Sequence, residues 1–248
     1  MNKKEKVVLA YSGGLDTSII AKWLVEKGYE VICCLVDVGQ KVEDLKKMKY
    51  KAIKICGASK VYIIPAQEEF IEKYIFQALK WNARYEDEYY MGTSLARPII
   101  AQKQIEVLKK ENATVASHGA TGKGNDQVRF EIAYYTLKPD VKIFAPWKDD
   151  EFIKTFPGRK EMIAYALKHG IPIKATVASP WSTDENLMHI SFESGILEDP
   201  WTKPPEHMFE YSISPEKAPN KVIKMTIEFV KGIPVKINGK KHSPIKLF

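Results

Sequence analysis

Short apolar runs alternate with stretches of helical periodicity along much of this chain. The runs at residues 7–10, 31–36 and 61–64 have the length of strands and are apolar throughout, which is typical of strands covered on both faces. Between them, apolar positions recur every three or four residues at 19–24 and 45–56. Strands joined by single helices pair in parallel through right-handed crossovers. The pattern therefore predicts an α/β fold, a parallel sheet with helices on both faces.

The alternation continues beyond the third strand. A helix is predicted over residues 70–79, and Pro98 suits the first turn of another. Strands are predicted at 114–116 and 143–147, and a helix at 158–169. These elements extend the same sheet.

Prolines change the pattern after residue 200. Five of them between 200 and 219 predict an extended linker. Residues 222–230 then alternate in the period-two pattern of an antiparallel strand, and Gly232 and the pair Asn238-Gly239 suit hairpin turns. The α/β fold is therefore followed by the start of an α+β second domain.

The first strand runs into a turn, residues 12–18, that reads Ser-Gly-Gly-Leu-Asp-Thr-Ser. Gly13 and Gly14 can adopt positive φ and let backbone N–H groups approach an anion at the start of the next helix. An alternative is that the glycines only turn the chain while Asp16 or Thr17 caps the helix. The turn is not a Walker A loop, because no Gly-Lys-Ser/Thr follows. It resembles the pyrophosphate loop of ATP pyrophosphatases, which holds the β- and γ-phosphates of ATP.

A second glycine-rich loop, residues 117–124, follows the strand predicted at 114–116. The carboxyl ends of parallel strands share one edge of a sheet. We therefore expect Gly13 and Gly119 to lie at the same edge, over one ligand. The alternative for this loop is that its charged residues are simply solvated.

Composition limits the class of protein. The chain has 248 residues, 45% of them hydrophobic, and a net charge of +7. No apolar run approaches the ~20 residues of a membrane span, so we expect no membrane partner and a cytoplasmic protein. The positive charge suits anionic ligands, but the lysines are scattered, and we expect no nucleic-acid partner. Cys33, Cys34 and Cys56 lie in apolar segments and are expected to be buried, reduced thiols without a metal.

Four motifs together carry a more specific resemblance. Residues 10–18, 91–98, 118–131 and 181–191 occur in the order found in the argininosuccinate synthase family. The resemblance implies a fold of the adenine nucleotide α-hydrolase type and a C–N ligase of arginine biosynthesis. Members join citrulline to aspartate with ATP and Mg²⁺: the ureido oxygen attacks the α-phosphorus, giving citrullyl-AMP and pyrophosphate, and the aspartate amine then displaces AMP.

The resemblance also implies roles for particular residues. None is a covalent catalyst, because the chemistry needs orientation and charge stabilisation, and no Mg²⁺ ligand is identified. The implied ATP-binding residues are Ala10, Tyr11, Ser12, Gly13, Gly14, Leu15, Asp16, Thr17, Ser18, Val36 and Gly119. The implied citrulline-binding residues are Tyr89, Ser94, Asn125, Arg129, Ser182 and Ser191. The implied aspartate-binding residues are Thr121, Asn125 and Asp126.

Four further residues lie beside these motifs. Arg97 and Lys123 are candidate extra cations for phosphates or carboxylates. His118 and His189 are interpreted as hydrogen-bonded core residues without a catalytic role. For Asp16 we favour helix capping over an interaction with Mg²⁺.

The resemblance divides the chain at residue 172. Residues 1–172 form the expected nucleotide-binding domain, and 173–248 the incomplete start of a synthetase and oligomerisation domain. Family members are longer and form homotetramers, so a C-terminally truncated form is expected. Two alternatives stay open: a tRNA-modifying adenylating enzyme with the same first loop, and a catalytically incomplete nucleotide-binding fragment.

Overall fold

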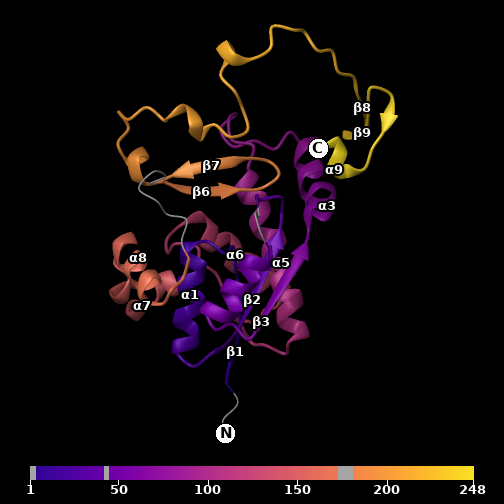
Figure 1. Ribbon diagram of the computed structural model, residues 1–248. Helices are drawn as coiled ribbons and strands as arrows, with labels where there is room; N and C mark the ends of the chain where they lie inside the picture. The colour runs from indigo at the N-terminus through magenta and orange to yellow at the C-terminus, as the bar shows by residue number, and fades with distance from the viewer. Residues whose placement is uncertain (1–3, 42–44, 173–180) are drawn as a thin grey trace. The chain divides into compact units, whose positions relative to one another are not determined.

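The structure, a computed structural model, describes residues 4–41, 45–172 and 181–248 (Figure 1). The chain forms two compact units. Unit 1 comprises Met1–Asp37, Val42–Ala66 and Ala96–Ala175, and unit 2 comprises Val38–Lys41, Gln67–Leu95 and Thr176–Phe248.

Unit 1 is built on a five-stranded parallel sheet in the order β3-β2-β1-β4-β5. Its strands are β1 Lys6–Ala10, β2 Glu30–Asp37, β3 Lys60–Pro65, β4 Val115–Ser117 and β5 Lys142–Phe144. In the central strand, Val7 lies between Val31 and Val115. The predicted parallel α/β fold is confirmed. Because the strand order reverses between β1 and β4, this is the point where such sheets bind ligands.

Helices cover both faces of this sheet (Figure 1). One face carries α1 Leu15–Glu26, α2 Leu45–Tyr50 with the π-helical turn η1 Lys51–Ile55, the 3₁₀ turn η3 Pro146–Lys148, α7 Asp150–Thr155 and α8 Arg159–Lys168. On the other face lie α5 Gly92–Lys110 and α6 Asn125–Leu137. There the Gln104 side chain donates to the carbonyls of Val8 and Ser117 at 2.7 and 2.8 Å, and accepts from Tyr134 at 2.5 Å. A buried amide thus ties β1 to β4.

Unit 2 contains the helical stretch predicted at 70–79 and two small antiparallel sheets. Its helices are α3 Gln67–Phe70, η2 Ile71–Ile75, α4 Phe76–Lys80, η4 Gly195–Glu198, η5 Glu206–Met208, η6 Pro215–Lys217 and α9 Pro244–Leu247. Its strands are β6 Ser182–Glu185, β7 Ile190–Glu193, β8 Ile227–Val230, β9 Ile233–Ile237 and β10 Lys240–Lys241. Gly232 and Gly239 have φ of +80° and +76°, which confirms the predicted hairpin turns.

Several local predictions were wrong. Pro98 lies inside α5, which begins six residues earlier at Gly92. The N-cap of α1 is Gly14, in an extended conformation with no side-chain cap bond, so neither Asp16 nor Thr17 caps it. The strand predicted at 143–147 ends at Phe144, because Pro146 starts a 3₁₀ turn. The antiparallel strand predicted from residue 222 begins at Ile227.

No helix among the described residues has the length and apolar character that crossing a bilayer requires.

Candidate functional site

The turn after β1 is held by hydroxyl groups from both of its sides. The Ser12 and Thr17 hydroxyls lie 3.0 Å apart, Thr17 also accepts from the Ser12 backbone N–H at 3.3 Å, and the Gly14 N–H donates to the Ser12 hydroxyl at 3.3 Å. Gly13 has φ of +74°, which favours glycine. The Ser18 hydroxyl is buried and pairs with the Tyr11 hydroxyl at 3.3 Å. The turn and the N-terminus of α1 therefore form a preorganised frame of donors.

Asp16 lies in the first turn of α1, beside this frame. Burial raises the pKa of its carboxyl, and hydrogen bonding to its own backbone and the charge of Arg159 oppose that rise. A carboxylate at a helix N-terminus is stabilised by the helix dipole. Asp16 therefore places a negative charge next to the turn, and this charge would repel a phosphate bound there.

The loop after β4 meets the turn after β1, as the sequence predicts. A Cβ atom on Gly119 would lie 3.0 Å from the Thr17 methyl and 3.5 Å from the Ile20 Cδ1. The same loop also packs against η3, because a Cβ on Gly122 would lie 2.5 Å from the Trp147 carbonyl oxygen. The backbone contact leaves no room for a side chain at Gly122, and a Cβ on Gly119 would require the Thr17 side chain to shift. Gly13 and Gly119 thus lie at one edge of the sheet, at the switch point.

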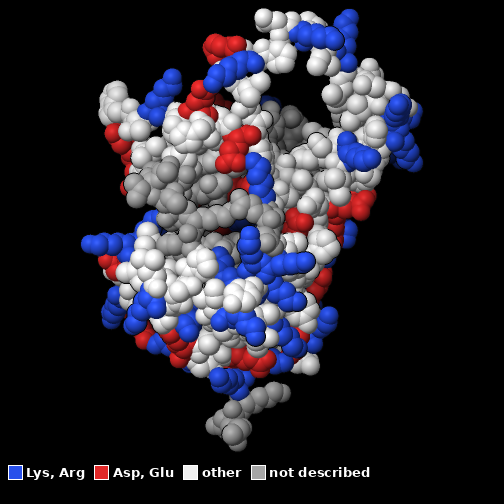
Figure 2. All heavy atoms as spheres, in the orientation of Figure 1, with Lys and Arg blue, Asp and Glu red and all other residues white. Residues whose placement is uncertain are grey.

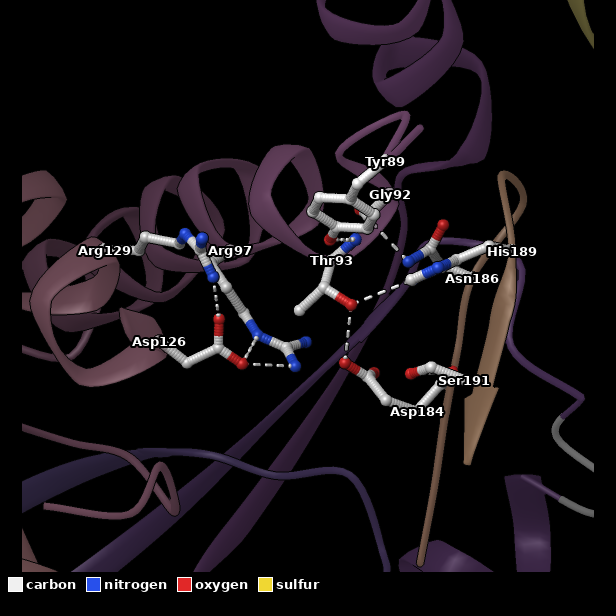
Figure 3. Close-up of polar contacts among 10 residues, drawn as sticks. All are labelled: Tyr89, Gly92, Thr93, Arg97, Asp126, Arg129, Asp184, Asn186, His189 and Ser191. Atoms are coloured by element: carbon white, nitrogen blue, oxygen red, sulfur yellow. Dashed lines mark hydrogen bonds and ion pairs between the residues drawn. The ribbon is translucent and has the colours of Figure 1, made fainter. Parts of the chain in front are cut away.

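The first turn of α6 carries a charged cluster in unit 1 (Figure 3). Asp126 accepts from Arg129 at 2.7 Å through one carboxylate oxygen. Its other oxygen accepts from Arg97, with Nε at 2.9 Å and Nη2 at 2.8 Å. Arg97, a candidate cation for phosphates or carboxylates, pairs here with Asp126. The cluster holds the two guanidinium groups and the carboxylate in fixed orientations.

Unit 2 contains a second polar cluster, built by Thr93 of α5 and the β6–β7 hairpin (Figure 3). The Thr93 hydroxyl donates to Asp184 at 3.0 Å and lies 2.8 Å from His189 Nε2. A carboxylate only accepts, so the Thr93 proton goes to Asp184 and His189 must donate through Nε2–H. The Tyr89 hydroxyl accepts from the Thr93 backbone N–H at 3.2 Å.

The same hairpin is fixed to the start of α5 by Asn186, which is buried and donates to the Gly92 carbonyl at 3.2 Å. A Cβ on Gly92 would lie 2.6 Å from the His189 ring. The Ser191 hydroxyl donates to the Asp184 carbonyl at 3.4 Å. Sequence reasoning missed the connecting roles of Thr93, Asp184 and Asn186, although all three lie inside the motifs that it had identified.

The remaining predicted residues occupy different environments. Ser94 has a buried hydroxyl with no hydrogen-bond partner among the described residues. Thr121 and Asn125 are exposed, and Val36 is buried near the carboxyl end of β2. Ser182 begins β6 opposite Glu193. These placements leave Ser94, Thr121 and Asn125 with polar groups that a ligand could engage.

His118 differs from the expected hydrogen-bonded core histidine. It is fully buried and stacks on Phe130 with ring centroids 5.2 Å apart, but neither ring nitrogen has a hydrogen bond within the described residues. Burial lowers its pKa to about 4, and Glu131, with a carboxylate oxygen 3.9 Å away, opposes the shift. The prediction of a core position was therefore right and that of a hydrogen bond was wrong. The ring is neutral at pH 7.

The cysteines are buried free thiols, as predicted. Burial raises the pKa of Cys34 to about 12 and that of Cys56 to about 11, so neither is an activated nucleophile. Among the described residues, no group of three or more His, Cys, Asp or Glu side chains could hold a metal ion. Figure 2 shows both signs of charge interspersed over its visible face.

Fold and site together define a class of α/β protein with a glycine-rich turn at the switch point of a parallel sheet. A family model described as "Arginosuccinate synthase N-terminal HUP domain" matches residues 6–172, and one described as "Arginosuccinate synthase C-terminal domain" matches residues 181–248. The chain belongs to the argininosuccinate synthase family.

Curated relatives agree with this assignment. An argininosuccinate synthase of Thermotoga petrophila is 53% identical over 99% of this chain, and the human argininosuccinate synthase is 53% identical over 97%. The one from Schizosaccharomyces pombe is 52% identical over 95%. The alignments take in 61%, 58% and 57% of those proteins, so the chain spans about three-fifths of their length.

Two solved structures align with the chain at low sequence identity. A predicted subunit of a tRNA methyltransferase from Methanocaldococcus jannaschii aligns with a TM-score of 0.41 at 15% identity, covering 73% of this chain and 78% of that one. A 4-thiouridine synthetase in complex with RNA and ATP aligns with a TM-score of 0.44 at 14% identity, covering 67% of this chain and 41% of that one.

Proposed function

We propose that this chain carries the ATP-dependent ligation of citrulline to aspartate, with release of AMP and pyrophosphate and with citrullyl-AMP as the intermediate. Family membership supports the reaction class. The single observation that carries the proposal is the contact between the turn after β1 and the loop after β4, where Gly119 lies against Thr17 at the switch point.

ATP would bind through the residues that the family resemblance implies. The Ser12 and Gly14 N–H groups and the hydroxyls of Ser12 and Thr17 would exchange their bonds within the turn for bonds to the β- and γ-phosphates. Gly119 would leave room for the nucleotide where a side chain would collide with α1. Buried residues such as Tyr11, Ser18 and Val36 would act by shaping the site rather than by offering donors.

The amino-acid substrates would use different chemistry. Arg129 presents a planar guanidinium suited to the citrulline carboxylate, and Asp126 can accept from the aspartate ammonium. Asn125, with a donor and an acceptor on one side chain, can serve both substrates. In unit 2, the Ser94 hydroxyl has no hydrogen-bond partner within the described part of the chain, which supports a citrulline role, and the Thr93 cluster would hold Tyr89 and Ser191 in place.

We propose that Mg²⁺ arrives on the phosphates of ATP. Mg²⁺ usually binds through substrate phosphates and one or two carboxylates, which fits a site where Asp16 is the nearby carboxylate. Bound there, the ion would neutralise charge that develops on the departing pyrophosphate.

The remaining assignments follow from the family. We propose a boundary at residue 172 between a nucleotide-binding domain and the start of a synthetase and oligomerisation domain. We also propose a cytoplasmic protein that forms homotetramers. Analytical ultracentrifugation of the 248-residue chain tests the assembly.

The reaction is tested by measuring AMP and pyrophosphate release with ATP, Mg²⁺, citrulline and aspartate. We expect pyrophosphate release to depend on citrulline. Isothermal titration calorimetry tests the nucleotide site separately, and we expect ATP to bind with Mg²⁺ present. No affinity for ATP or pyrophosphate would contradict the proposal, and release that depends on a tRNA in place of citrulline would favour the other adenylating class.

A matched pair of variants sharpens this test. Gly13→Ala should weaken pyrophosphate binding most, because its φ is +74° and the new Cβ would lie 2.5 Å from the Met48 methyl. Gly14→Ala should weaken binding less, since its φ is −71° and its nearest neighbour would be the Ser12 hydroxyl at 3.3 Å. Equal effects would show that the conformation of Gly13 is not what the site requires.

A further inference from the structure

The phosphate-type turn is supported by one face of the helical stretch α2–η1. Met48 and Lys51 are three residues apart and lie on the same side of the helix. The Met48 methyl covers Gly13 so closely that a Cβ there would lie 2.5 Å away. Lys51 Nζ donates to the Gly13 carbonyl at 2.5 Å. Two side chains of another segment therefore fix the position of the central residue of the turn.

The turn itself brings no positive charge. Residues 11–18 contain no lysine or arginine, and the Asp16 carboxylate lies in the first helical turn beside it. In loops of the Walker A type, a lysine within the motif reaches the phosphates. Here the Lys51 ammonium, from η1, lies 2.5 Å from the Gly13 carbonyl oxygen. Its charge therefore lies beside the turn where a phosphate would bind.

We propose that Lys51 is the positioning residue and the cation of the pyrophosphate site, supplied from η1 in place of a lysine within the loop. This inference rests on the proposed binding of ATP at the turn. Lys51 holds the Gly13 carbonyl, which keeps the N–H groups of the turn directed at the anion, and its charge attracts the β- and γ-phosphates. The substrate class that it recognises is a pyrophosphoryl group.

A purely structural role makes a different prediction. Lys51 also donates to the Pro172 carbonyl at 3.4 Å, so it could serve only to tie chain segments together. Loss of such a tie would lower stability and affect all nucleotide ligands equally. Loss of a cation for the β- and γ-phosphates would weaken binding of pyrophosphate and ATP while leaving AMP unaffected.

Calorimetry on the 248-residue chain in Mg²⁺ buffer separates these roles, with inorganic pyrophosphate and AMP as probes. We expect Lys51→Met to weaken pyrophosphate binding by about tenfold to a hundredfold, the range for a hydrogen bond to a charged group, and to change AMP binding less than about twofold. Lys51→Arg should restore most of the affinity. Lys51→Gln keeps a donor for Gly13 without the charge, so it should recover part of the affinity that Lys51→Met loses and still bind pyrophosphate more weakly than the unmodified chain.

The matched control is Lys54→Met, which removes the same charge from an exposed position of η1. It should bind both probes like the unmodified chain. Pyrophosphate affinity of Lys51→Met and Lys51→Gln within twofold of the unmodified chain would overturn the inference, as would equal losses for pyrophosphate and AMP. Absence of pyrophosphate binding by the unmodified chain would instead overturn the proposed function, and this inference with it.

Discussion

The two main sheets of this protein use similar residues in opposite environments. The central strand β1 reads Lys-Val-Val-Leu-Ala, and Val7, Val8 and Leu9 are 0% exposed. Strand β8 reads Ile-Glu-Phe-Val, and Phe229 is 54% exposed. Strand propensity is alike in the two strands, since both are rich in β-branched and large apolar residues. Burial, and not propensity, is therefore what separates them.

This difference explains where the proposed chemistry lies. The turn after β1 and the loop after β4 extend from strands covered by helices on both faces, which gives them a rigid base. The large apolar side chains of residues 222–230 are exposed, and none of the sequence motifs lies there. A rigid, doubly covered sheet positions donors, whereas a half-covered sheet cannot.

The largest effect is expected from a cavity in the covered sheet. Leu9→Ala should lower the free energy of unfolding by about 4 kcal/mol, because truncation of a buried leucine removes contacts and leaves a void. Urea unfolding followed by circular dichroism measures it. Phe229→Ala is the control and should cost less than about 1 kcal/mol, because much of its ring already contacts solvent. Similar values for the two variants would remove the contrast between the sheets.

The next effect is a pH dependence that originates at the end of β4. Burial lowers the pKa of His118 to about 4, so the unfolded chain binds a proton more readily than the folded one between pH 6.5 and about 4. The contribution of the neutral His118 ring to the free energy of unfolding is therefore fully present above pH 6.5. It is lost as the pH falls from 6.5 to about 4, by on the order of 2–3 kcal/mol.

His118→Phe tests this assignment, since it keeps the stacking on Phe130 and removes the titrating group. Unfolding free energies measured from pH 7.5 to 4 should fall less steeply in the variant than in the unmodified chain. Parallel curves would mean that the ring is protonated in the folded state at the same pH as in the unfolded one.

A smaller effect is expected at the opposite end of the covered sheet. The nearly buried Glu111 carboxylate accepts from Lys60 at 2.8 and 2.9 Å and from Tyr62 at 2.5 Å, and these partners lower its pKa to about 2. Glu111→Gln should cost about 1–3 kcal/mol at pH 7. The stabilisation that depends on the ionised Glu111 carboxylate is present above pH 4.5 and is lost as the pH falls towards about 2.

Glu106→Gln is the matched control, because Glu106 lies on the same helix and pairs with Lys103 at the surface. A salt bridge whose carboxylate is about half exposed, as that of Glu106 is, is worth less than about 1 kcal/mol. If the two variants unfold at the same urea concentration, then the Glu111 network does not stabilise the sheet.

The sequence predicts the strands of the covered sheet but not all the strands of unit 2, for physical reasons. Continuous apolar runs at 7–10 and 31–36 predict doubly covered strands, and glycines directly after two strands predict the two loops. Strand β6 reads Ser-Thr-Asp-Glu, which has no apolar alternation to reveal it. Pro98 misled because its preference for a first helical turn is local, while the start of α5 is fixed by contacts with the β6–β7 hairpin.

The candidate site shows the same limit. The residue types of the motifs could be recognised, but not the pairs that they form. Thr93 meets Asp184 across 91 positions of sequence, and Lys51 meets Gly13 across 38. Such contacts depend on tertiary packing, which no local pattern encodes. The sequence likewise could not predict that the His118 ring nitrogens have no hydrogen bond among the described residues, since a buried histidine normally has a partner.

The smallest effect on stability is expected in the exposed stretch, residues 222–230. Val222 is 82% exposed, so Val222→Ser should change the free energy of unfolding by less than about 0.5 kcal/mol in either direction. The reference is Val8→Ser, which places a hydroxyl in the fully buried strand and should destabilise strongly. A cost above 1 kcal/mol for Val222→Ser would mean that residues 222–230 are covered in solution. The contrast in burial between the two sheets would then come from a contact that covers residues 222–230 in solution, and not from a difference in how the two sheets are built.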